Sequence, residues 1–521
     1  MQWTKGNGLK SIVVGALALI WEKKVKIIVN NEMCIGCNIC VKVCPQKVLE
    51  LRDLKSYCFD IERCMGCFGC EDECPHNAIR VIRAPQYVKD IKIEPPLNIS
   101  ECDVAIVGAG PAGIGAAITC AKAGLNTVVF ERLPNRELSH HTDGGVLFTM
   151  PEISSVKVEN SKILFPELDI SINSDIVRKC EALGLIGPNG LSTISKIPDN
   201  IKGYASNKDK LIKSLIEEAE NAGAKVWFNA KVTDVLKSDN NIIGVKLESG
   251  EEIKAKVTIT ADGIMAKISE KAGMKISKKE PWYVNVLAYE WDNIENLPSQ
   301  LYYLNGGMKK FDENVDAIFG AVAITDVVHV MAVTLSRKKF NPSDKPIDYF
   351  VEQVMKDDRI TNFLSKNILS QKPKVLTGCR GIFRDKPNRD IVVSGAVSVG
   401  DAWVDDGEIG NVGALSHGVH AAKVIIKAFE KNDFSKESLL PANDFITDNL
   451  VSMLEKNKEM KLLDTKFSED ELLQMFEIMK HMNYPVMLLG SKTQQAKMFT
   501  GFMFKNFINM FRYFKVFKKL M

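Results

Sequence analysis

The chain has 521 residues, a formal net charge of +3 and 45% hydrophobic residues, which are ordinary values for a globular protein of two to four domains. No stretch reaches the roughly 18 consecutive apolar residues of a membrane-spanning helix. Nine of the 13 cysteines lie within residues 34–74 and the others are scattered singly, which excludes a disulfide scaffold and favours a reducing, cytoplasmic compartment.

Residues 1–25 form the first segment. Its apolar run, Ser11 to Trp21, has lysines on both sides and superficially resembles an export signal. The run has no small-residue cleavage site before the charged stretch and no twin-arginine pair. We therefore expect a short amphipathic helix that lies on a membrane surface or packs against the body of the protein.

Residues 26–95 carry one cysteine pattern twice, C-x-x-C-x-x-C-x-x-x-C-P, which is typical of two-cluster ferredoxins. In this pattern three thiolates hold one 4Fe-4S cluster and the fourth reaches across to the other. The predicted ligands are Cys34, Cys37, Cys40 and Cys74 for the first cluster, and Cys64, Cys67, Cys70 and Cys44 for the second. A zinc ribbon would need its ligands in two pairs, which this grouping does not supply. Cys58 falls outside the ligand spacing, and we expect it to pack in the core.

A second motif follows the linker at Pro95-Pro96. An apolar strand over Asp103 to Val107 runs into a glycine-rich turn and an alanine-rich helix, and a second strand over Thr127 to Phe130 ends at an acidic residue. This is the dinucleotide-binding unit, in which the glycines allow a tight turn and close approach to a pyrophosphate at a helix N-terminus. The acid is placed to accept hydrogen bonds from a ribose. The predicted binding residues are Gly108, Gly110, Pro111, Ala112, Gly113 and Glu131.

Two later motifs favour FAD over NAD. They are Asp262-Gly263, after an apolar run that begins at Thr258, and Gly400-Asp401, after a strand expected over Asp390 to Ser398. With the first glycine motif, they resemble the flavoprotein class that includes para-hydroxybenzoate hydroxylase. Within it, residues 101–430 resemble the geranylgeranyl reductase family and the electron-transfer-flavoprotein:quinone oxidoreductases.

This resemblance implies the architecture. A Rossmann-like α/β FAD-binding domain would take residues 101–280 and 377–430, and an antiparallel sheet on the substrate side of the flavin would take residues 281–376. With them we expect an α+β ferredoxin domain and a helical C-terminal region over residues 431–521. In the resemblance, Asp262, Gly263, Gly400 and Asp401 bind FAD. Lys208 stands where relatives carry an arginine that contacts the flavin.

Candidate proton donors lie on the segment after the first βαβ unit, which in this class can run close to the flavin. They are His140, His141 and Asp143. The alternative for all three is a solvated polar loop. Asp405, Asp406 and Glu408, near the late motif, are further candidates, and they too can be charges that flank a helix.

The C-terminus is basic and amphipathic. No acidic residue follows Glu477, whereas eight lysines and arginines do. From Phe499 to Met521, phenylalanines and methionines recur every three or four residues, which places them on one helix face. Such a helix can lie on an anionic membrane surface, or it can dock on its own core. We expect peripheral attachment to the cytoplasmic membrane, and no nucleic-acid binding, because no recognition motif accompanies the charge.

Three functions follow. The first is an FAD-dependent iron–sulfur oxidoreductase that takes electrons from a low-potential donor such as a ferredoxin and reduces carbon–carbon double bonds of a prenyl lipid. The second is a quinone oxidoreductase of the electron-transfer-flavoprotein type. The third is an electron-carrier subunit of a larger redox complex. All three require FAD and two 4Fe-4S clusters, because clusters move single electrons and FAD can also pass a hydride.

Overall fold

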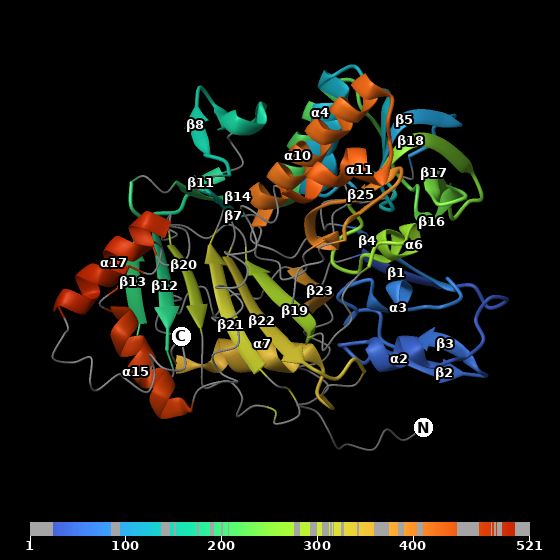
Figure 1. Ribbon diagram of the computed structural model, residues 1–521. Coiled ribbons are helices and arrows are strands. Elements are labelled where there is room, and N and C mark those ends of the chain that lie inside the picture. Colours follow the sequence, from blue (N-terminus) through green and yellow to red (C-terminus); the bar gives the residue numbers. More distant parts are fainter. Residues whose placement is uncertain are drawn as a thin grey trace, which may run out of the picture.

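The computed structural model shows three packed parts (Figure 1). A small domain at the N-terminal end lies beside two larger sheets with their helices. The described residues are 24–84, 94–136, 146–150, 153–173, 177–187, 192–199, 202–206, 208–275, 282–291, 300–304, 312, 315, 317–324, 328–340, 343–358, 375–383, 390–403, 410–444, 468–480, 482–483, 486 and 492–505. The predicted N-terminal helix over residues 1–25 lies almost entirely outside them.

The first part is the ferredoxin domain, which comprises β1 to β4. Strand β1 (Lys24–Val29) pairs antiparallel with β4 (Ile79–Ala84), and β2 (Leu49–Arg52) pairs with β3 (Lys55–Cys58). The alternation of β1 turns Val25, Ile27 and Val29 toward a small core and leaves Lys26 and Ile28 exposed. Two short helices, α2 (Ile39–Val43) and α3 (Gly69–Asp72), each follow a cysteine loop.

The second part, the FAD-binding part, is built on an eight-stranded sheet. Its strands are β5 (Glu101–Val107), β6 (Thr127–Phe130), β15 (Lys225–Trp227), β16 (Val232–Ser238), β17 (Asn241–Leu247), β18 (Glu252–Thr260), β24 (Val392–Val393) and β25 (Ala396–Ser398). Strands β15, β6, β5, β18 and β25 are parallel neighbours, and β16, β17 and β18 form an antiparallel meander. Strand β6 and most of β5 are buried, because helices and the meander cover both faces.

Two helices cross closely over this sheet, α4 (Pro111–Lys122) and α10 (Gly410–Lys431). A Cβ atom at Gly418 would collide with the carbonyl oxygen of Ala112, and one at Gly115 would lie 2.7 Å from the carbonyl oxygen of Leu415. Glycine at both positions therefore sets the separation of the two helix backbones. Helix α5 (Lys208–Asn221) packs beside α4 and buries its Leu and Ile face.

The strand expected over Asp390 to Ser398 is a hairpin of β24 and β25 instead. The chain reverses at Gly395, whose φ is +78°, and a side chain there would collide with the carbonyl oxygen of Ile242. The apolar run concealed this turn, because glycine between two short strands can still read as one strand.

The third part is a seven-stranded sheet in the order β13-β12-β20-β21-β22-β19-β23. Its strands are β12 (Ala182–Ile186), β13 (Ser192–Lys196), β19 (Trp282–Trp291), β20 (Gln300–Leu304), β21 (Ala317–Ile324), β22 (Val328–Ser336) and β23 (Val375–Phe383). Neighbours are antiparallel as expected, except for the parallel pair of β12 and β20. The sheet extends beyond residues 281–376, since β12 and β13 come from the range assigned to FAD binding. Helix α7 (Ile347–Lys356) packs its Phe and Val side chains on one face.

Smaller elements complete the fold. Strands β7 (Val146–Phe148), β14 (Gly203–Ser206) and β11 (Val177–Lys179) form one sheet, and β8 (Lys157–Glu159), β9 (Lys162–Phe165) and β10 (Ile170–Asn173) form another. The remaining helices are α6 (Lys267–Ala272), α11 (Lys436–Leu439), α15 (Glu469–Lys480), α17 (Lys492–Lys505) and the 3-10 turns η1 (Pro166–Leu168), η3 (Gly400–Ala402) and η4 (Leu440–Asn443).

The basic C-terminal region is described only as far as α17. In this helix Phe502 is buried and Phe499 is 44% exposed, while residues 506–521 lie outside the described residues. The membrane-binding face therefore stays a prediction. None of the helices described is both long enough and apolar enough to span a bilayer.

The close crossing of α4 and α10 gives a stability prediction. Gly418→Ala should lower the apparent unfolding free energy by about 1–3 kcal/mol, because a methyl group forces two backbones apart. Gly501→Ala in α17 is the matched control, since a Cβ there meets no atom within 4 Å and alanine favours a helix. Thermal unfolding of both variants checks this, and equal melting temperatures would contradict it.

Candidate functional site

The cysteine duplication is also a duplication of backbone conformation. Positive φ angles recur at an offset of 30 residues, at Gly36 and Gly66, Asn38 and Phe68, and Lys47 and Asn77. Asn38 and Phe68 each precede the short helix that carries the third cysteine of a triple. The two cysteine loops therefore have the same local fold.

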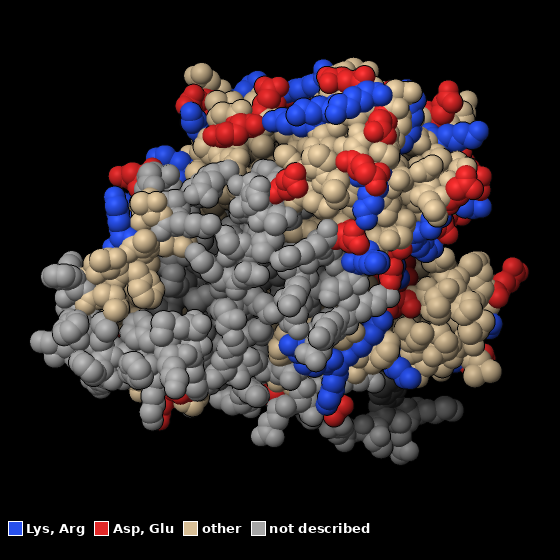
Figure 2. All heavy atoms as spheres, in the orientation of Figure 1, with Lys and Arg blue, Asp and Glu red and all other residues tan. Residues whose placement is uncertain are grey.

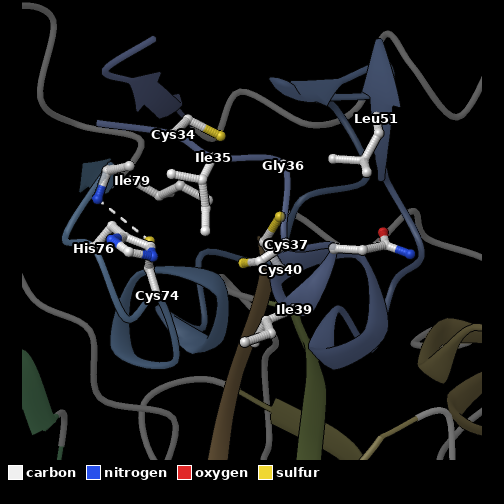
Figure 3. A pocket seen from close by; sticks show the side chains of 12 residues that line it. Cys34, Ile35, Gly36, Cys37, Ile39, Cys40, Leu51, Cys74, His76 and Ile79 are labelled. Carbon is white, nitrogen blue, oxygen red and sulfur yellow. Dashed lines mark hydrogen bonds between the residues drawn. The ribbon is translucent and has the colours of Figure 1, made fainter. Parts of the chain in front are cut away.

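The first cysteine set lies around one pocket of the ferredoxin domain (Figure 3). Cys34, Cys37 and Cys40 line it, and Cys74 joins them from the other half of the domain. Two contacts orient the sulfurs. The Cys74 Sγ accepts a hydrogen bond from the Ala78 N–H at 3.3 Å, and the Cys40 Sγ lies 3.2 Å from the Ser56 hydroxyl.

The second set is gathered in the same way but lies deeper. Burial raises the pKa of Cys67 to about 12, and the nearby Cys44 and Cys64 raise it as well. Burial, followed by the same group of sulfurs, also holds the pKa of Cys70 well above its usual value. Cys44 comes from the other half of the domain, so each set again combines three cysteines with one from across the repeat.

Both sets suit a 4Fe-4S cluster by their chemistry. Four soft thiolates surround one space, and iron binding would supply the energy to deprotonate buried thiols. Within the described residues, no three His, Cys, Asp or Glu side chains converge on a point that could hold one metal ion. A cluster does not require that convergence, because each thiolate binds its own iron atom.

The two sets face opposite ways. Cys37 of the first set is exposed, and its neighbour Ile35 is 62% exposed. In the second set, Met65 is buried in the core of the seven-stranded sheet, and Cys67 packs against that core. The first set is therefore the outer one, and the second set is the inner one, next to the rest of the protein.

Three consecutive acids after Cys70 hold this orientation. Glu71 pairs with Lys231 at 2.8 Å, Asp72 pairs with Arg132 at 2.8 Å, and Glu73 pairs with Arg380 at 3.1 Å and with Lys339 at 2.8 Å. Figure 2 shows positive and negative side chains gathered along this boundary. The cations come from both large sheets, so the ferredoxin domain is fixed to each of them.

Further contacts support the same docking. Arg63 and Asp348 form a bidentate ion pair with distances of 3.0 to 3.2 Å. The Ile347 N–H donates to the Pro45 carbonyl oxygen at 3.0 Å, directly beside Cys44. The start of α7 thus holds the loop that carries one predicted ligand of the inner cluster.

The first glycine motif has the expected geometry for a nucleotide. Gly108 has φ +101° and lies against the Ala261 carbonyl oxygen, while a Cβ at Gly113 would collide with the Gly108 carbonyl oxygen. Gly110 is the N-cap of α4, Pro111 and Ala112 begin the helix, and a Cβ at Gly110 would meet no atom within 4 Å. Space is therefore left where a pyrophosphate would meet the helix N-terminus.

Glu131 is buried at the end of β6. Its carboxylate accepts hydrogen bonds from the Ala109 N–H at 2.8 Å and the Leu133 N–H at 3.0 Å. A carboxylate has about four acceptor positions, so these bonds leave room for ribose hydroxyls while fixing the group beside the glycine turn.

The middle motif has a structural role that the resemblance did not indicate. Asp262 accepts hydrogen bonds from the Ile268 N–H at 2.6 Å and the Ser269 hydroxyl at 2.8 Å, so it holds the start of α6. Burial raises the pKa of this carboxyl group. Gly263 has φ +70° and turns the chain away from β18.

The late motif brings Gly400 and Asp401 to the same region. Gly400 has φ +67°, and a Cβ there would lie 2.7 Å from the Ala112 Cβ in the first motif. The Gly400 N–H donates to His417 Nδ1 at 3.0 Å. His417 is fully buried, burial lowers its pKa to about 3, and its Nε2 has no hydrogen-bond partner among the described residues.

These observations fit FAD at this place. Space is open beside Gly110, and the first and late motifs lie against each other. The buried N–H of His417, which has no partner among the described residues, lies beside the motif that would hold the ribityl chain. Nothing in the sequence pattern singled out His417. Lys208 is buried, and its Nζ donates to the Asn411 side chain at the start of α10.

The proposed proton donors His140, His141 and Asp143 lie outside the described residues, as do Asp405, Asp406 and Glu408. Sequence reasoning also missed the cations of the docking surface. The only signal was the run of three acids after Cys70, and its partners are 60 to 307 residues away in the chain.

Comparison with known proteins agrees with the assignment of the cysteine motif and of the glycine motif. Residues 101–370 match the family described as FAD binding domain, and residues 33–78 match the 4Fe-4S dicluster domain. The chain is 25% identical over 398 residues to the digeranylgeranylglycerophospholipid reductase of Thermoplasma acidophilum, covering 72% of this chain and 91% of that one. It is 26% identical over 363 residues to Protein FixC of Salmonella typhimurium, covering 65% and 79%.

A solved structure shares the fold. The crystal structure of a geranylgeranyl bacteriochlorophyll reductase-like protein from Thermoplasma acidophilum matches with a TM-score of 0.62 at 22% identity, over 78% of this chain and 99% of that one. This likeness supports the Rossmann-like domain with its second sheet, which the sequence resemblance implied.

The ligand assignment predicts which cysteines carry iron. Cys37→Ser should reduce the iron content from about eight atoms per chain toward about four, with loss of the outer-cluster signal alone. Cys58→Ser is the control, because Cys58 packs in the core of the same domain without belonging to either set. Iron analysis and electron paramagnetic resonance of the reduced protein test this. Full iron in the Cys37 variant, or iron loss in the Cys58 variant, would refute the assignment.

Proposed function

The chain belongs to the FAD binding domain family, and from this premise we propose that it passes electrons from two 4Fe-4S clusters through FAD to a lipophilic acceptor. With the 4Fe-4S dicluster domain and relatives named as reductases, it is an FAD-dependent iron–sulfur oxidoreductase similar to geranylgeranyl reductases. When bound, the clusters supply single electrons and FAD supplies the conversion to hydride transfer.

One observation carries the electron route. The inner cysteine set packs against the seven-stranded sheet, whereas the outer set has an exposed cysteine. A low-potential donor such as a ferredoxin would therefore meet the outer cluster, and the inner cluster would face the flavin-binding body. The ion pairs of Glu71, Asp72 and Glu73 keep this order fixed.

The first candidate acceptor is an isoprenoid double bond of a prenyl lipid. The similarity to digeranylgeranylglycerophospholipid reductases over most of their length supports it. The match to Protein FixC supports the alternative, a quinone oxidoreductase of the electron-transfer-flavoprotein type.

An anaerobic titration separates the two. Dithionite-reduced protein is mixed with a geranylgeranyl lipid or with a quinone, and flavin absorbance is followed. For the first function, we expect the lipid to reoxidise the flavin and to gain the mass of about two hydrogens per reduced double bond. Quinol formation alone would establish the second, and inertness to both would refute the proposal in favour of a carrier subunit.

Attachment to a membrane would bring such an acceptor to the protein, and the basic C-terminus is the proposed contact. Removing residues 506–521 deletes Arg512, Lys515, Lys518 and Lys519 while leaving α17 intact. The shortened protein should lose binding to vesicles that contain anionic lipid, because each basic residue contributes about 1 kcal/mol near such a surface. Sedimentation with neutral vesicles is the control, and unchanged binding to anionic vesicles would reject the contact.

A further inference from the structure

A second pocket lies between the ferredoxin domain and the seven-stranded sheet, and it is lined by positive charge. Its lysines and arginine come from both sides of the junction: Lys42, Lys47, Lys339, Lys345 and Arg380. The described residues that line it include no aspartate or glutamate. Like charges at one pocket repel each other, so an anion held there would be stabilised.

The floor of the pocket is a polar rung across three strands. Asn285 of β19 lies opposite Thr334 of β22 and opposite Arg380 of β23. Paired residues on neighbouring strands share one face of a sheet, and all three line the pocket. Each is at most 7% exposed, so three polar side chains are buried where the rest of the sheet is mainly apolar.

Neighbouring acidic side chains neutralise only part of the positive charge around the pocket. Glu73 neutralises charge on Arg380 and Lys339, and Asp312 accepts a hydrogen bond from the Ser343 hydroxyl at the pocket edge. Lys42 and Lys47 form no ion pair within the described part of the chain. Within the part of the chain that the structure describes, no acidic side chain pairs with the lysines on the ferredoxin side of the pocket.

Asn285 is a polar side chain of the pocket floor whose hydrogen bonding is incomplete. It is 7% exposed, and its Oδ1 has no hydrogen-bond partner among the described residues. A buried amide without a partner costs about 1–3 kcal/mol. Only the NH2 end of this amide can donate to an oxyanion, so a bound anion would require that end to face the pocket.

From these observations we infer that the pocket binds a compact oxyanion, namely phosphate or the phosphoryl group of a larger molecule. Lys42 and Lys47 would supply charge from the ferredoxin side, and Asn285 would donate from the sheet. The cavity volume of about 30 Å³ suits a group of this size, since one water needs about 10–15 Å³. The site involves both parts of the protein and does not depend on which acceptor FAD serves.

The test uses the full-length protein with its clusters and FAD. Inorganic phosphate is titrated calorimetrically at constant ionic strength, and a soluble short-chain phosphatidic acid is titrated in parallel. Wild type should bind at least one of them, and Lys42→Gln/Lys47→Gln should weaken that binding about tenfold or more. Lys26→Gln/Lys157→Gln removes two exposed lysines outside the pocket and should bind like wild type.

The two probes distinguish the source of the phosphoryl group. Binding of inorganic phosphate identifies a free-anion site, and binding of the lipid alone identifies a headgroup site. Asn285→Asp places a carboxylate on the floor and should abolish binding by repulsion. If this buried substitution prevents folding, the Lys42→Gln/Lys47→Gln variant still tests the inference. Absence of binding for both probes, or binding that the Lys42/Lys47 variant leaves unchanged, overturns the inference.

Discussion

The ion pairs of three consecutive acids, Glu71, Asp72 and Glu73, are the interaction on which the arrangement of the molecule depends. They follow Cys70 directly, so any movement of these acids also moves the loop of the inner cysteine set. Their partners are held by the backbone of both large sheets, and the pairs of Glu71 and Glu73 are largely buried. Losing one partner of a buried pair costs about 3–5 kcal/mol, because the other charge is left without compensation.

A buried ion pair often contributes little net stability, because the cost of removing two charges from water offsets much of their attraction. An apolar junction could hold the ferredoxin domain as firmly, but it would tolerate small rotations that a set of matched charges does not. Rotation matters here because the two cysteine sets differ in their surroundings. With Met65 in the core of the sheet and Cys37 exposed, this orientation gives an inner and an outer cysteine set. The charges therefore fix which cysteine set lies next to the rest of the protein.

The parts of the site that are formed by residues close together in the chain could be predicted from the sequence. The cysteines that the spacing groups together, with Cys44 and Cys74 exchanged between the halves, do lie near one another, because ligand spacing is a short-range property. Their binding of two clusters stays a prediction. The glycine motif likewise predicted β5, α4 and β6. The strand expected up to Ser398 was wrong in detail, since only the tertiary contact of Gly395 with Ile242 shows why the chain must turn there.

Long-range features could not be predicted in the same way. Arg380 meets Glu73 across 307 residues, and no periodicity in β23 distinguishes an arginine that points at another domain from one that points at water. His417 reads as an ordinary helix residue until Gly400 is seen to donate to its ring. Asp262 is expected to bind FAD, which stays a prediction, and its carboxylate also holds the start of α6.

The pocket at the junction follows from the same docking. Arg380 is part of the polar rung with Asn285 and Thr334, and it also carries the ion pair with Glu73. One buried arginine thus belongs to both the docking surface and the pocket floor. Because Cys44 lines this pocket as well, a group bound there would lie against a predicted ligand of the inner cluster. A negative charge at that position would oppose the addition of an electron to a cluster held by Cys44, so the proposed occupancy of the pocket would be coupled to reduction of that cluster through ordinary electrostatics.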